Sequence, residues 1–373
     1  MSRTLVVTND FPPRPGGIQG FVHSLVVRQP VGSVVVYASS APGSAEFDAA
    51  QPFPILRHPS SLLLPTGGTA RRVARVARTQ DCTSVLFGAA APLGLLAPSL
   101  RRAGVRRLVA LTHGHEVGWA ALPGARALLR RIGASVDAVT YLGEYTRSRL
   151  RCVLGPSVRL ERLAPGVDTS VFTPWADGGA VRAALGLEGR PVVVCVSRLV
   201  PRKGQDVLIR SLAAVRSTVS GAALLLVGGG PDMPRLQRLA VSCGVADDVV
   251  FTGAVSWPEL PAYYAAGNVF AMPCRTRRGG LDVEGLGMVY LEASATGLPV
   301  VAGDSGGAPD AVLDSRTGYV VDGRSVDAVV QRVGALLADP TEAQALGVKG
   351  RVWVEREWRW DVVASRLGAL LAH

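Results

Sequence analysis

The feature of this chain that most constrains its fold is the regular alternation of short apolar runs with longer amphipathic stretches. Short runs rich in Val and Leu are typical of buried parallel strands, and amphipathic stretches between them are typical of helices that cover a sheet. The first half is predicted to contain strands at Thr4–Thr8, Ser33–Tyr37, Ser84–Phe87, Arg107–Leu111, Ala138–Tyr141 and Val158–Leu163, with helices at Arg71–Arg78, Leu93–Arg102 and Ala125–Ile132.

A second series of the same kind follows a break at residues 164–190, where Pro, Gly and Asp interrupt the pattern. Residues 327–371 at the end of the chain are predicted to be nearly all helical. The other elements of this series are predicted strands at Val192–Val196, Ala223–Val227, Val249–Thr252, Val269–Met272, Val300–Ala302 and Tyr319–Val321, with helices that include Val207–Val219 and Pro234–Cys243.

These patterns predict an α/β protein with two Rossmann-like, doubly wound domains that face a central cleft. A chain of 373 residues is too long for one compact core. We expect an N-terminal domain at 1–165, a linker at 166–190 and a C-terminal domain at 191–357, with a terminal helix at about 358–373 that packs back on the first domain. Ligands of such folds bind outside the carboxyl ends of the strands, so residues just after predicted strands are the candidates for function.

The excess positive charge of the chain lies in its first half. Residues 1–165 hold 20 Arg, no Lys and 8 acidic residues, a balance of +12, whereas residues 166–373 hold 20 Arg and Lys and 21 acidic residues, a balance of −1. This asymmetry favours contact of the first half with an anionic partner such as a lipid surface or nucleic acid, with Arg-solvated helix faces as the alternative.

Targeting and redox features are few. No apolar stretch of about 20 residues predicts a spanning helix, and the N-terminus predicts a strand and not a signal peptide. Five scattered cysteines predict buried, reduced thiols in a cytosolic protein.

The loop after the first predicted strand contains Gly16 and Gly17 directly before a helix. Paired glycines let the backbone approach a ligand closely, and a helix N-terminus offers amide donors to a phosphate. The loop lacks the G-x-G-x-x-G pattern of dinucleotide-binding domains and the G-K-[ST] pattern of P-loops. An ordinary turn is the alternative interpretation.

The segment Thr112-His113-Gly114-His115-Glu116 ends another predicted strand of the first half. Histidine at the carboxyl edge of a sheet suits a polar role beside a substrate. The alternatives are a structural surface role and a metal site, although a third metal ligand at suitable spacing is lacking.

In the second half, Arg198 and Lys203 flank a turn at Pro201 between a strand and a helix. The planar fork of Arg and the point charge of Lys could converge on one diphosphate, with two solvated cations as the alternative. Lys203 is one of only two lysines among 40 cations, which favours a specific need for an ammonium group there. The glycines 228–230 at the next strand end offer another close approach to a ligand.

The most informative stretch is Pro273–Glu292, a polar, Gly-rich loop that leads from a strand into a helix. Backbone amides around Gly287, Met288 and Val289 begin this helix. Because the amino end of a helix carries free amides and a partial positive charge, it is suited to bind a phosphate.

Two carboxylates flank this helix start, with Glu284 before it and Glu292 inside it. Carboxylates are poor phosphate ligands but good acceptors for sugar hydroxyls, so one could hold a ribose and the other a transferred sugar. Asp282-x-Glu284 also resembles the D-x-D pattern of metal sites. Because Arg198 and Lys203 already supply positive charge, we expect no metal.

The Glu-x7-Glu pattern, preceded by Ser197-Arg-x-x-Pro-x-Lys-Gly204, resembles the retaining GT-B glycosyltransferases of the GT4 type. The resemblance extends from Val6 to Trp360 and looks most like the phosphatidylinositol mannosyltransferases of actinobacteria. The segments that carry this closer likeness are Asn9–Gln19, Phe87–Pro92, Thr112–Trp119, Ser197–Asp206 and Arg275–Glu292.

This resemblance implies a metal-independent, retaining transfer of mannose from GDP-mannose to the inositol 6-position of phosphatidylinositol monomannoside, giving the dimannoside. It implies a cytoplasmic protein that binds peripherally to the anionic inner face of the plasma membrane, with no nucleic-acid partner. In the implied site, Arg198 and Lys203 grip the diphosphate, Glu292 binds the ribose, Glu284 holds the mannose and His113 lies beside it. The remaining candidates are Gly16, Gly17, Gly229, Gly287, Met288 and Val289 for the donor, Asp10, Gln19 and His115 for the acceptor, and Arg126, Arg130 and Arg131 for the lipid surface.

Two other hypotheses fit the same residues less well. One keeps the fold and the retaining chemistry but uses another nucleotide sugar and a soluble acceptor. The other is a non-enzymatic module that binds nucleic acid or membrane. Nucleic-acid motifs are absent from the sequence and aromatic residues make up only 6% of it, which disfavours the nucleic-acid version.

Overall fold

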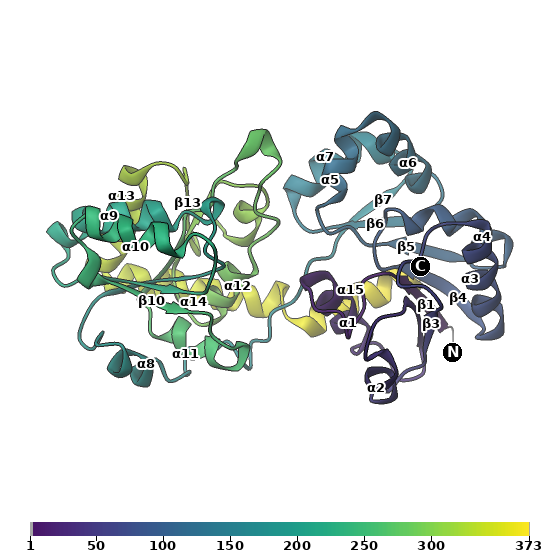
Figure 1. Cartoon of the computed structure of the whole chain (residues 1–373), viewed down its shortest axis with the longest axis horizontal. Helices are drawn as coiled ribbons and strands as arrows, with labels where there is room; N and C mark the ends of the chain where they lie inside the picture. Colours follow the sequence, from purple (N-terminus) through teal and green to yellow (C-terminus); the bar gives the residue numbers. More distant parts are fainter. Residues whose placement is uncertain (1–2, 373) are drawn as a thin grey trace. The chain divides into compact units, whose positions relative to one another are not determined.

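The computed structural model describes residues 3–372 and divides into two compact units (Figure 1). The first unit holds the chain up to Gly166 and from Trp360 onward, and the second holds Val167–Arg359. The chain therefore passes from one unit to the other at two places. Just inside the second unit these places adjoin, because the Val167 amide donates to the Trp358 carbonyl at 2.8 Å.

The first unit is built on a seven-stranded, all-parallel sheet with strand order β3-β2-β1-β4-β5-β6-β7. Val6 of the central strand pairs with Val36 on one side and Leu86 on the other. The strand β2 is buried along its whole length, as expected for a strand covered on both faces. The strands are β1 Arg3–Thr8, β2 Val34–Ser39, β3 Ile55–His58, β4 Cys82–Phe87, β5 Arg107–Ala110, β6 Ala138–Tyr141 and β7 Arg159–Arg162.

Helices cover both faces of this sheet and enclose two apolar clusters. The cluster on one face includes residues of the last helix, because Val363, Leu367 and Leu370 pack among residues of α1 and the central strands. Figure 1 shows this helix beside α1. The helices are α1 Gly17–Val26, α2 Ser44–Ala49, α3 Gly67–Thr79, α4 Ala97–Arg102, α5 Glu116–Ala121, α6 Pro123–Gly133, α7 Glu144–Leu154 and α15 Trp360–Ala372.

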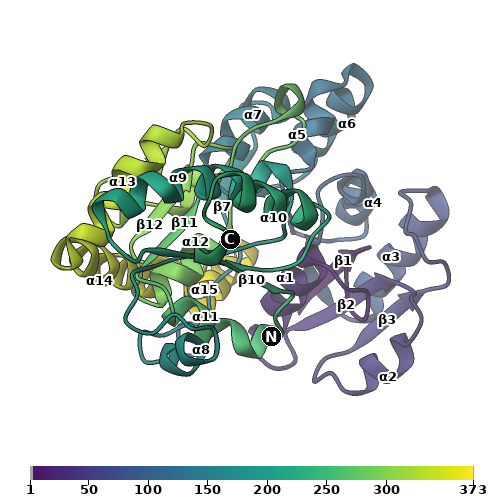
Figure 2. The same ribbon diagram turned by 60° about the vertical axis from the view of Figure 1, so that its left-hand side comes forward.

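The second unit has a six-stranded, all-parallel sheet with strand order β10-β9-β8-β11-β12-β13. Its strands are β8 Val192–Val196, β9 Ala223–Val227, β10 Val249–Gly253, β11 Val269–Met272, β12 Val300–Gly303 and β13 Gly318–Val321. Figure 2 shows α9 beside α13, and α12 packs against α14. The helices are α8 Gly178–Ala184, α9 Gln205–Thr218, α10 Met233–Ser242, α11 Leu260–Ala265, α12 Met288–Ala295, α13 Val326–Ala338 and α14 Pro340–Glu357.

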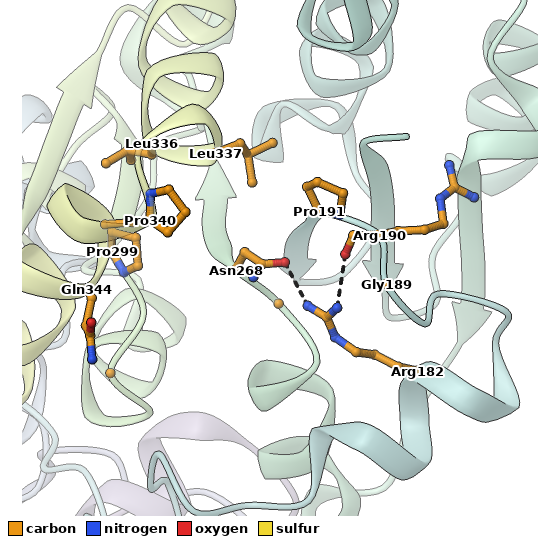
Figure 3. Close-up of a pocket in the computed structure, with 13 residues that line it drawn as sticks. Arg182, Gly189, Arg190, Pro191, Asn268, Pro299, Leu336, Leu337, Pro340 and Gln344 are labelled. Atoms are coloured by element: carbon orange, nitrogen blue, oxygen red, sulfur yellow. Dashed lines mark hydrogen bonds between the residues drawn. The ribbon is translucent and has the colours of Figure 1, made fainter. Parts of the chain in front are cut away.

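The stretch that we expected to be a linker, 166–190, forms part of the second unit from Val167 onward. Its helix α8 packs against α11. Arg182 of α8 donates to the Ala266 carbonyl at 2.9 Å. It also donates to the Arg190 carbonyl at 3.0 Å and the Asn268 side chain at 2.7 Å (Figure 3), which ties α8 to the segments just before β8 and β11. A half-buried arginine with three acceptors is a packing feature that the Gly and Asp content of the sequence does not reveal.

A cavity of about 470 Å³ lies beside Arg182 (Figure 3). Pro191, Asn268 and Pro299 line it just before β8, β11 and β12 begin, so it opens at the amino-terminal edge of the sheet. In doubly wound folds the ligand site is at the opposite edge. This cavity is therefore separate from the candidate site described below.

All the predicted strands are confirmed, with ends that differ by no more than two residues. The edge strand β3 was missed because none of its four residues is fully buried, so it has no clear apolar pattern. The predicted helix Leu93–Arg102 is a 3-10 turn at Leu93–Leu96 followed by α4. The helical C-terminal stretch is confirmed as three helices, α13, α14 and α15.

Candidate active site

The candidate residues of the second unit lie in loops that follow neighbouring strands. Arg198 and Lys203 follow β8, Gly229 follows β9, and Glu284 lies in the loop that follows β11. Since β9, β8 and β11 are adjacent in a parallel sheet, their carboxyl ends bring these three loops to one edge. The fold therefore places residues that are distant in sequence at one ligand-binding edge.

Lys203 and Glu284 form a close charged contact at this edge. The Lys203 Nζ lies 2.7 Å from the Glu284 Oε2, and both side chains are about nine-tenths buried. A pair this close and this buried is costly to break, because either charge alone would lack both water and a partner. The structure thus joins two of the residues predicted for catalysis directly to one another.

The backbone of Glu284 is fixed by the loop after β12. Its amide donates to Ser305 Oγ at 3.2 Å, and its carbonyl accepts from the Gly307 amide at 2.9 Å. Gly306 passes so closely that a Cβ there would lie 2.1 Å from the Glu284 carbonyl oxygen. The carboxylate consequently projects from a backbone that is held at several points.

Arg198 is exposed, and within residues 3–372 its guanidinium has no hydrogen-bond or ion-pair partner. The loop that holds Arg198 packs closely on the glycines after β9. A Cβ at Gly228 would lie 2.1 Å from the Ser197 carbonyl oxygen. Gly230 is just as constrained by Leu199, whereas a Cβ at Gly229 would meet Ala254 at an ordinary 3.7 Å. Packing therefore explains Gly228 and Gly230, while Gly229 has no such reason.

The helix α12 begins at Met288 with Gly287 before it, and no side chain caps its first amides. Gly287 has φ of 83°, and a Cβ there would lie 2.4 Å from the ring of Tyr290. That ring cannot move freely because its hydroxyl donates to the Met272 carbonyl at 2.7 Å. Met288 and Val289 are half-buried beside this uncapped end, which is suited to an anion.

Glu292 lies in the second turn of α12, where the Tyr264 hydroxyl donates to its Oε2 at 2.7 Å. Burial raises the pKa of Glu292 above its ordinary value, and the hydrogen bond from Tyr264 opposes that rise. Burial also raises the pKa of Tyr264, so its hydroxyl remains a donor. One carboxylate oxygen is thus held by the protein, which leaves the other for a ligand hydroxyl.

In the first unit, Asp10 follows β1 and Gln19 lies in the first turns of α1. The Gln19 Nε2 donates to the Asp10 Oδ1 at 2.9 Å. Gly16 and Gly17 are exposed, and a Cβ at Gly16 would lie 2.1 Å from the Gln19 Oε1. The glycine at position 16 therefore makes room for the amide that holds Asp10.

His113 follows β5, and its Nε2 lies 2.5 Å from the Gly88 carbonyl oxygen after β4. Because a carbonyl only accepts, Nε2 carries the hydrogen, and the neutral ring leaves Nδ1 as an acceptor. Burial lowers the pKa of His113, which favours this neutral form.

Glu116 is fully buried and holds both histidines of this segment. Its Oε2 accepts from the His113 amide at 3.0 Å, and its Oε1 lies 3.3 Å from the Nε2 of His115, which is exposed. The Glu116 carboxylate therefore orders the histidine loop. Among the described residues, no group of three or more His, Cys, Asp or Glu side chains is arranged to hold a metal ion.

Sequence reasoning missed several residues that shape the edge of the second sheet. Arg202 contacts both Asp282 and Glu284, and Arg275 donates to both oxygens of Asp206 at 2.9 and 2.8 Å. Tyr264, which holds Glu292, comes from a helix without any motif. The only available signal was the position of Arg202 and Arg275 next to or inside the recognised motifs.

Two family models match the chain over most of its length. The model described as Glycosyltransferase Family 4 matches residues 15–171, and the model described as Glycosyl transferases group 1 matches residues 180–353. A GDP-mannose-dependent alpha-(1-6)-phosphatidylinositol monomannoside mannosyltransferase from Mycolicibacterium smegmatis is 55% identical over 99% of this chain and 98% of its own. The chain belongs to the GT4-type glycosyltransferases.

A second relative of this glycosyltransferase comes from Corynebacterium glutamicum. It is a GDP-mannose-dependent monoacylated alpha-(1-6)-phosphatidylinositol monomannoside mannosyltransferase, 46% identical over 99% of this chain and 97% of its own.

Solved structures share the fold at low sequence identity. Alr3699/HepE from Anabaena, determined in complex with UDP, has a TM-score of 0.80 at 18% identity and covers 99% of both chains. Sucrose-phosphate synthase from Thermosynechococcus elongatus has a TM-score of 0.74 at 22% identity, covering 99% of this chain and 98% of its own. Both likenesses confirm the predicted GT-B architecture.

Proposed function

We propose that this glycosyltransferase moves mannose from GDP-mannose to the inositol 6-position of phosphatidylinositol monomannoside, with retention of configuration. The observation that carries this proposal is the buried Lys203–Glu284 pair beside the unpaired Arg198, at the strand edge where the Glu-x7-Glu motif stands. The relatives with nearly full-length similarity are named for the same donor and acceptor.

In this proposal the donor binds along the edge of the second sheet. Arg198, Lys203 and the first amides of α12 hold the diphosphate and stabilise the charge that develops on the departing GDP. Glu292 accepts from the ribose hydroxyls through its free oxygen. Glu284 accepts from the mannose hydroxyls.

The transfer step needs no group beyond the two substrates and these side chains. The bond between the mannose C1 and the phosphate oxygen breaks, and a bond from C1 to the inositol oxygen forms on the same face. The proton of the inositol hydroxyl passes to the phosphate oxygen of the leaving GDP. The atoms and charges balance, because GDP departs carrying the electron pair of the broken bond.

We further propose that the reaction needs no metal ion. The Asp282-x-Glu284 carboxylates, which resemble a D-x-D metal pattern, each contact a cation of the chain: Arg202 for Asp282, and Lys203 for Glu284. Turnover is therefore expected to be unchanged by EDTA. A loss of activity in EDTA that Mg²⁺ or Mn²⁺ restores would contradict this part of the proposal.

The acceptor is a lipid, so we propose that the first unit docks peripherally on the anionic cytoplasmic face of the membrane. On α6 the guanidinium groups of Arg126, Arg130 and Arg131 are exposed, together with the apolar side chains of Leu122 and Leu128. Cations mixed with exposed apolar groups are typical of helices that lie at a lipid interface. Within residues 3–372, no helix is both long and apolar enough to cross a bilayer.

A second basic surface of the first unit supports the same docking. Between α3 and α4 lies a groove of about 440 Å³ lined by Arg71, Arg75, Arg78 and Arg102. None of these four forms an ion pair among the described residues, so their charge is available to lipid phosphates. We propose no nucleic-acid partner, because the carboxylates of the second unit would repel a phosphate backbone.

The proposal is tested with purified protein, GDP-[14C]mannose and phosphatidylinositol monomannoside in mixed vesicles. The expected product is a labelled dimannoside whose new linkage has the α configuration. UDP-glucose, UDP-N-acetylglucosamine and GDP-glucose serve as competing donors. Failure to label the lipid with GDP-mannose, together with transfer from a UDP-sugar, would overturn the donor assignment.

A further inference from the structure

Arg202 contacts two acidic residues of the loop after β11. Its Nε lies 3.7 Å from the Glu284 Oε2, and one terminal guanidinium nitrogen lies 3.5 Å from the Asp282 Oδ1. The Nε is buried and has no hydrogen-bond partner in the part of the chain that the structure describes, although it faces a carboxylate oxygen just beyond bonding distance. An unpaired buried donor beside an acceptor favours any shift that closes the gap.

The oxygen that Arg202 faces is the one that Lys203 contacts at 2.7 Å. In the proposed function Lys203 also binds the diphosphate of the donor, so its ammonium has to serve two anions. When Lys203 turns toward a diphosphate, Glu284 loses part of its nearest positive charge. After Lys203, Arg202 is the next nearest cation to the Glu284 carboxylate.

The charges of this cluster are consistent with Lys203 binding the diphosphate while Arg202 stays with Glu284. Asp282 and Glu284 carry two negative charges, and Arg202 and Lys203 carry two positive ones. A donor diphosphate brings further negative charge toward Glu284. Without Arg202, only Lys203 would separate the Glu284 carboxylate from the diphosphate. Repulsion between these two anions would turn the carboxylate away from the sugar.

The position of Asp282 is fixed by a tight turn. Arg277 and Asp282 pair through two backbone hydrogen bonds, of 2.9 and 3.2 Å, and close a hairpin over Arg278–Gly280. Arg202 in turn holds the other side of this loop, since its carbonyl accepts from the Arg275 amide at 2.8 Å. The carboxylate of Asp282 is therefore a fixed anchor for one end of the Arg202 guanidinium.

We infer that Arg202, anchored by Asp282, is a positioning residue that keeps the Glu284 carboxylate directed at the transferred sugar while Lys203 binds the diphosphate. The inference rests on the proposed function and adds a residue to it. This positioning role requires the planar guanidinium of arginine. A lysine ammonium at the end of a flexible chain cannot hold the Asp282 and Glu284 carboxylates in fixed directions.

The test compares Arg202→Gln, Arg202→Lys and Asp282→Asn with the parent protein. Arg210→Gln is the matched control, because Arg210 is an exposed arginine on α9 of the same unit. Mannosyl transfer is measured as kcat and KM for GDP-mannose, and calorimetry gives the Kd of GDP and of GDP-mannose for each variant. GDP lacks the sugar, so it reports on the diphosphate site alone.

Arg202→Gln is expected to lower kcat by about tenfold or more, the effect of losing one contact to a charged group. Its Kd for GDP should stay within about threefold of the parent, while the preference for GDP-mannose over GDP falls. Arg202→Lys should recover only part of the loss. Asp282→Asn should change kcat in the same direction, and the double variant should lose less than the two single losses combined.

Two results would overturn the inference. Equal weakening of GDP and GDP-mannose binding by Arg202→Gln would make Arg202 a direct diphosphate ligand. Parent-like kcat and binding in Arg202→Gln would remove any role in positioning. A parent protein that binds GDP-mannose but transfers no mannose would refute the proposed function instead, and the ratio of the two Kd values would still decide the role of Arg202.

Discussion

At the scale of single residues, the edge of the second sheet is organised by buried charges that hold one another. Lys203 and Glu284 lie in different loops, after β8 and after β11, and meet at 2.7 Å. Glu292 is held separately by Tyr264. The contacts to Glu284 from Lys203 and Arg202, and the bond to Glu292 from Tyr264, all involve the Oε2 atom of the carboxylate. In the proposed function the other oxygen accepts from hydroxyl groups of the donor.

Replacement of Lys203 by Ala is expected to lower kcat/KM by about 100- to 1,000-fold, the usual loss when a preorganised charge is removed from a transition state. The radiolabelled transfer assay measures this loss. Lys349→Ala is the control, since that exposed lysine lies on α14 outside the candidate site. A Lys203→Ala protein within twofold of the parent would refute its assignment to the diphosphate.

The affinity for GDP is expected to depend on pH through Glu292. Because burial raises the pKa of this carboxyl, part of the population is protonated just above the ordinary value of 4.5, and the ionised form accepts better from a ribose. The Kd of GDP should therefore fall as the pH rises through the raised pKa, and then level off.

Calorimetric titrations across this range check the expectation, with Glu292→Gln as the variant that lacks the titrating group. The difference between parent and variant cancels the titration of the nucleotide itself. Tyr264→Phe removes the hydrogen bond that lowers the pKa of Glu292, so it should move the transition to higher pH. The same pH profile in parent and Glu292→Gln would exclude Glu292 as the group responsible.

At the scale of secondary-structure elements, the start of α12 depends on a glycine with a left-handed backbone. A side chain at Gly287 would meet both an unfavourable φ of 83° and the ring of Tyr290 at 2.4 Å. Gly287→Ala should therefore lower the free energy of unfolding by about 1–3 kcal/mol and weaken GDP binding, since the helix end must shift.

Thermal unfolding and GDP titration measure the two effects of this substitution. Gly285→Ala is a close control, because it lies in the same loop and a Cβ there would meet no atom within 4 Å. If both variants bind GDP as the parent does, the amino end of α12 does not contact the diphosphate.

The last helix, α15, belongs to the apolar core of the first unit although it follows the whole second unit in sequence. Leu367 is buried among residues of that core, so Leu367→Ala should cost about 2–5 kcal/mol of unfolding free energy. Denaturant titration checks the value against Ser365→Ala, which changes an exposed position on the same helix. An equal, small effect of both would show that α15 contributes little to the stability of the unit.

At the scale of the whole molecule, the two units carry different charges, and we propose different tasks for them. The arginines of α6 and of the groove between α3 and α4 all belong to the first unit, and the proposed donor residues belong to the second. Binding to vesicles should therefore depend on the first unit, and binding to GDP on the second.

A variant with Arg126, Arg130 and Arg131 changed to Gln should bind vesicles rich in anionic lipid less tightly and with a weaker dependence on salt. Its Kd for GDP should equal that of the parent. Vesicle co-sedimentation at several salt concentrations measures the first property, and calorimetry the second. Unchanged sedimentation, with loss of binding after substitution of Arg71, Arg75 and Arg78, would transfer the docking surface to the groove beside α3.

The two parallel sheets could be predicted from the sequence, because buried strands and the helices that cover them have distinct apolar periods. The candidate donor residues could also be proposed from the sequence, since Arg198, Lys203, Glu284 and Glu292 stand at strand ends and a helix start that could be recognised locally. The prediction of mannose, guanine and inositol rested on the resemblance of the motifs to a known family, and not on the spacing of the residues.

Which of these residues contact one another could be seen only in the folded structure. The contact of Lys203 with Glu284, the place of Arg202 between Asp282 and Glu284, and the support of Glu292 by Tyr264 all join separate elements. The same holds for residues 167–190, which belong to the second unit, where Arg182 of α8 bonds to the Ala266 carbonyl just before β11. Such contacts depend on how strands are ordered and packed, which the local pattern of residues does not record.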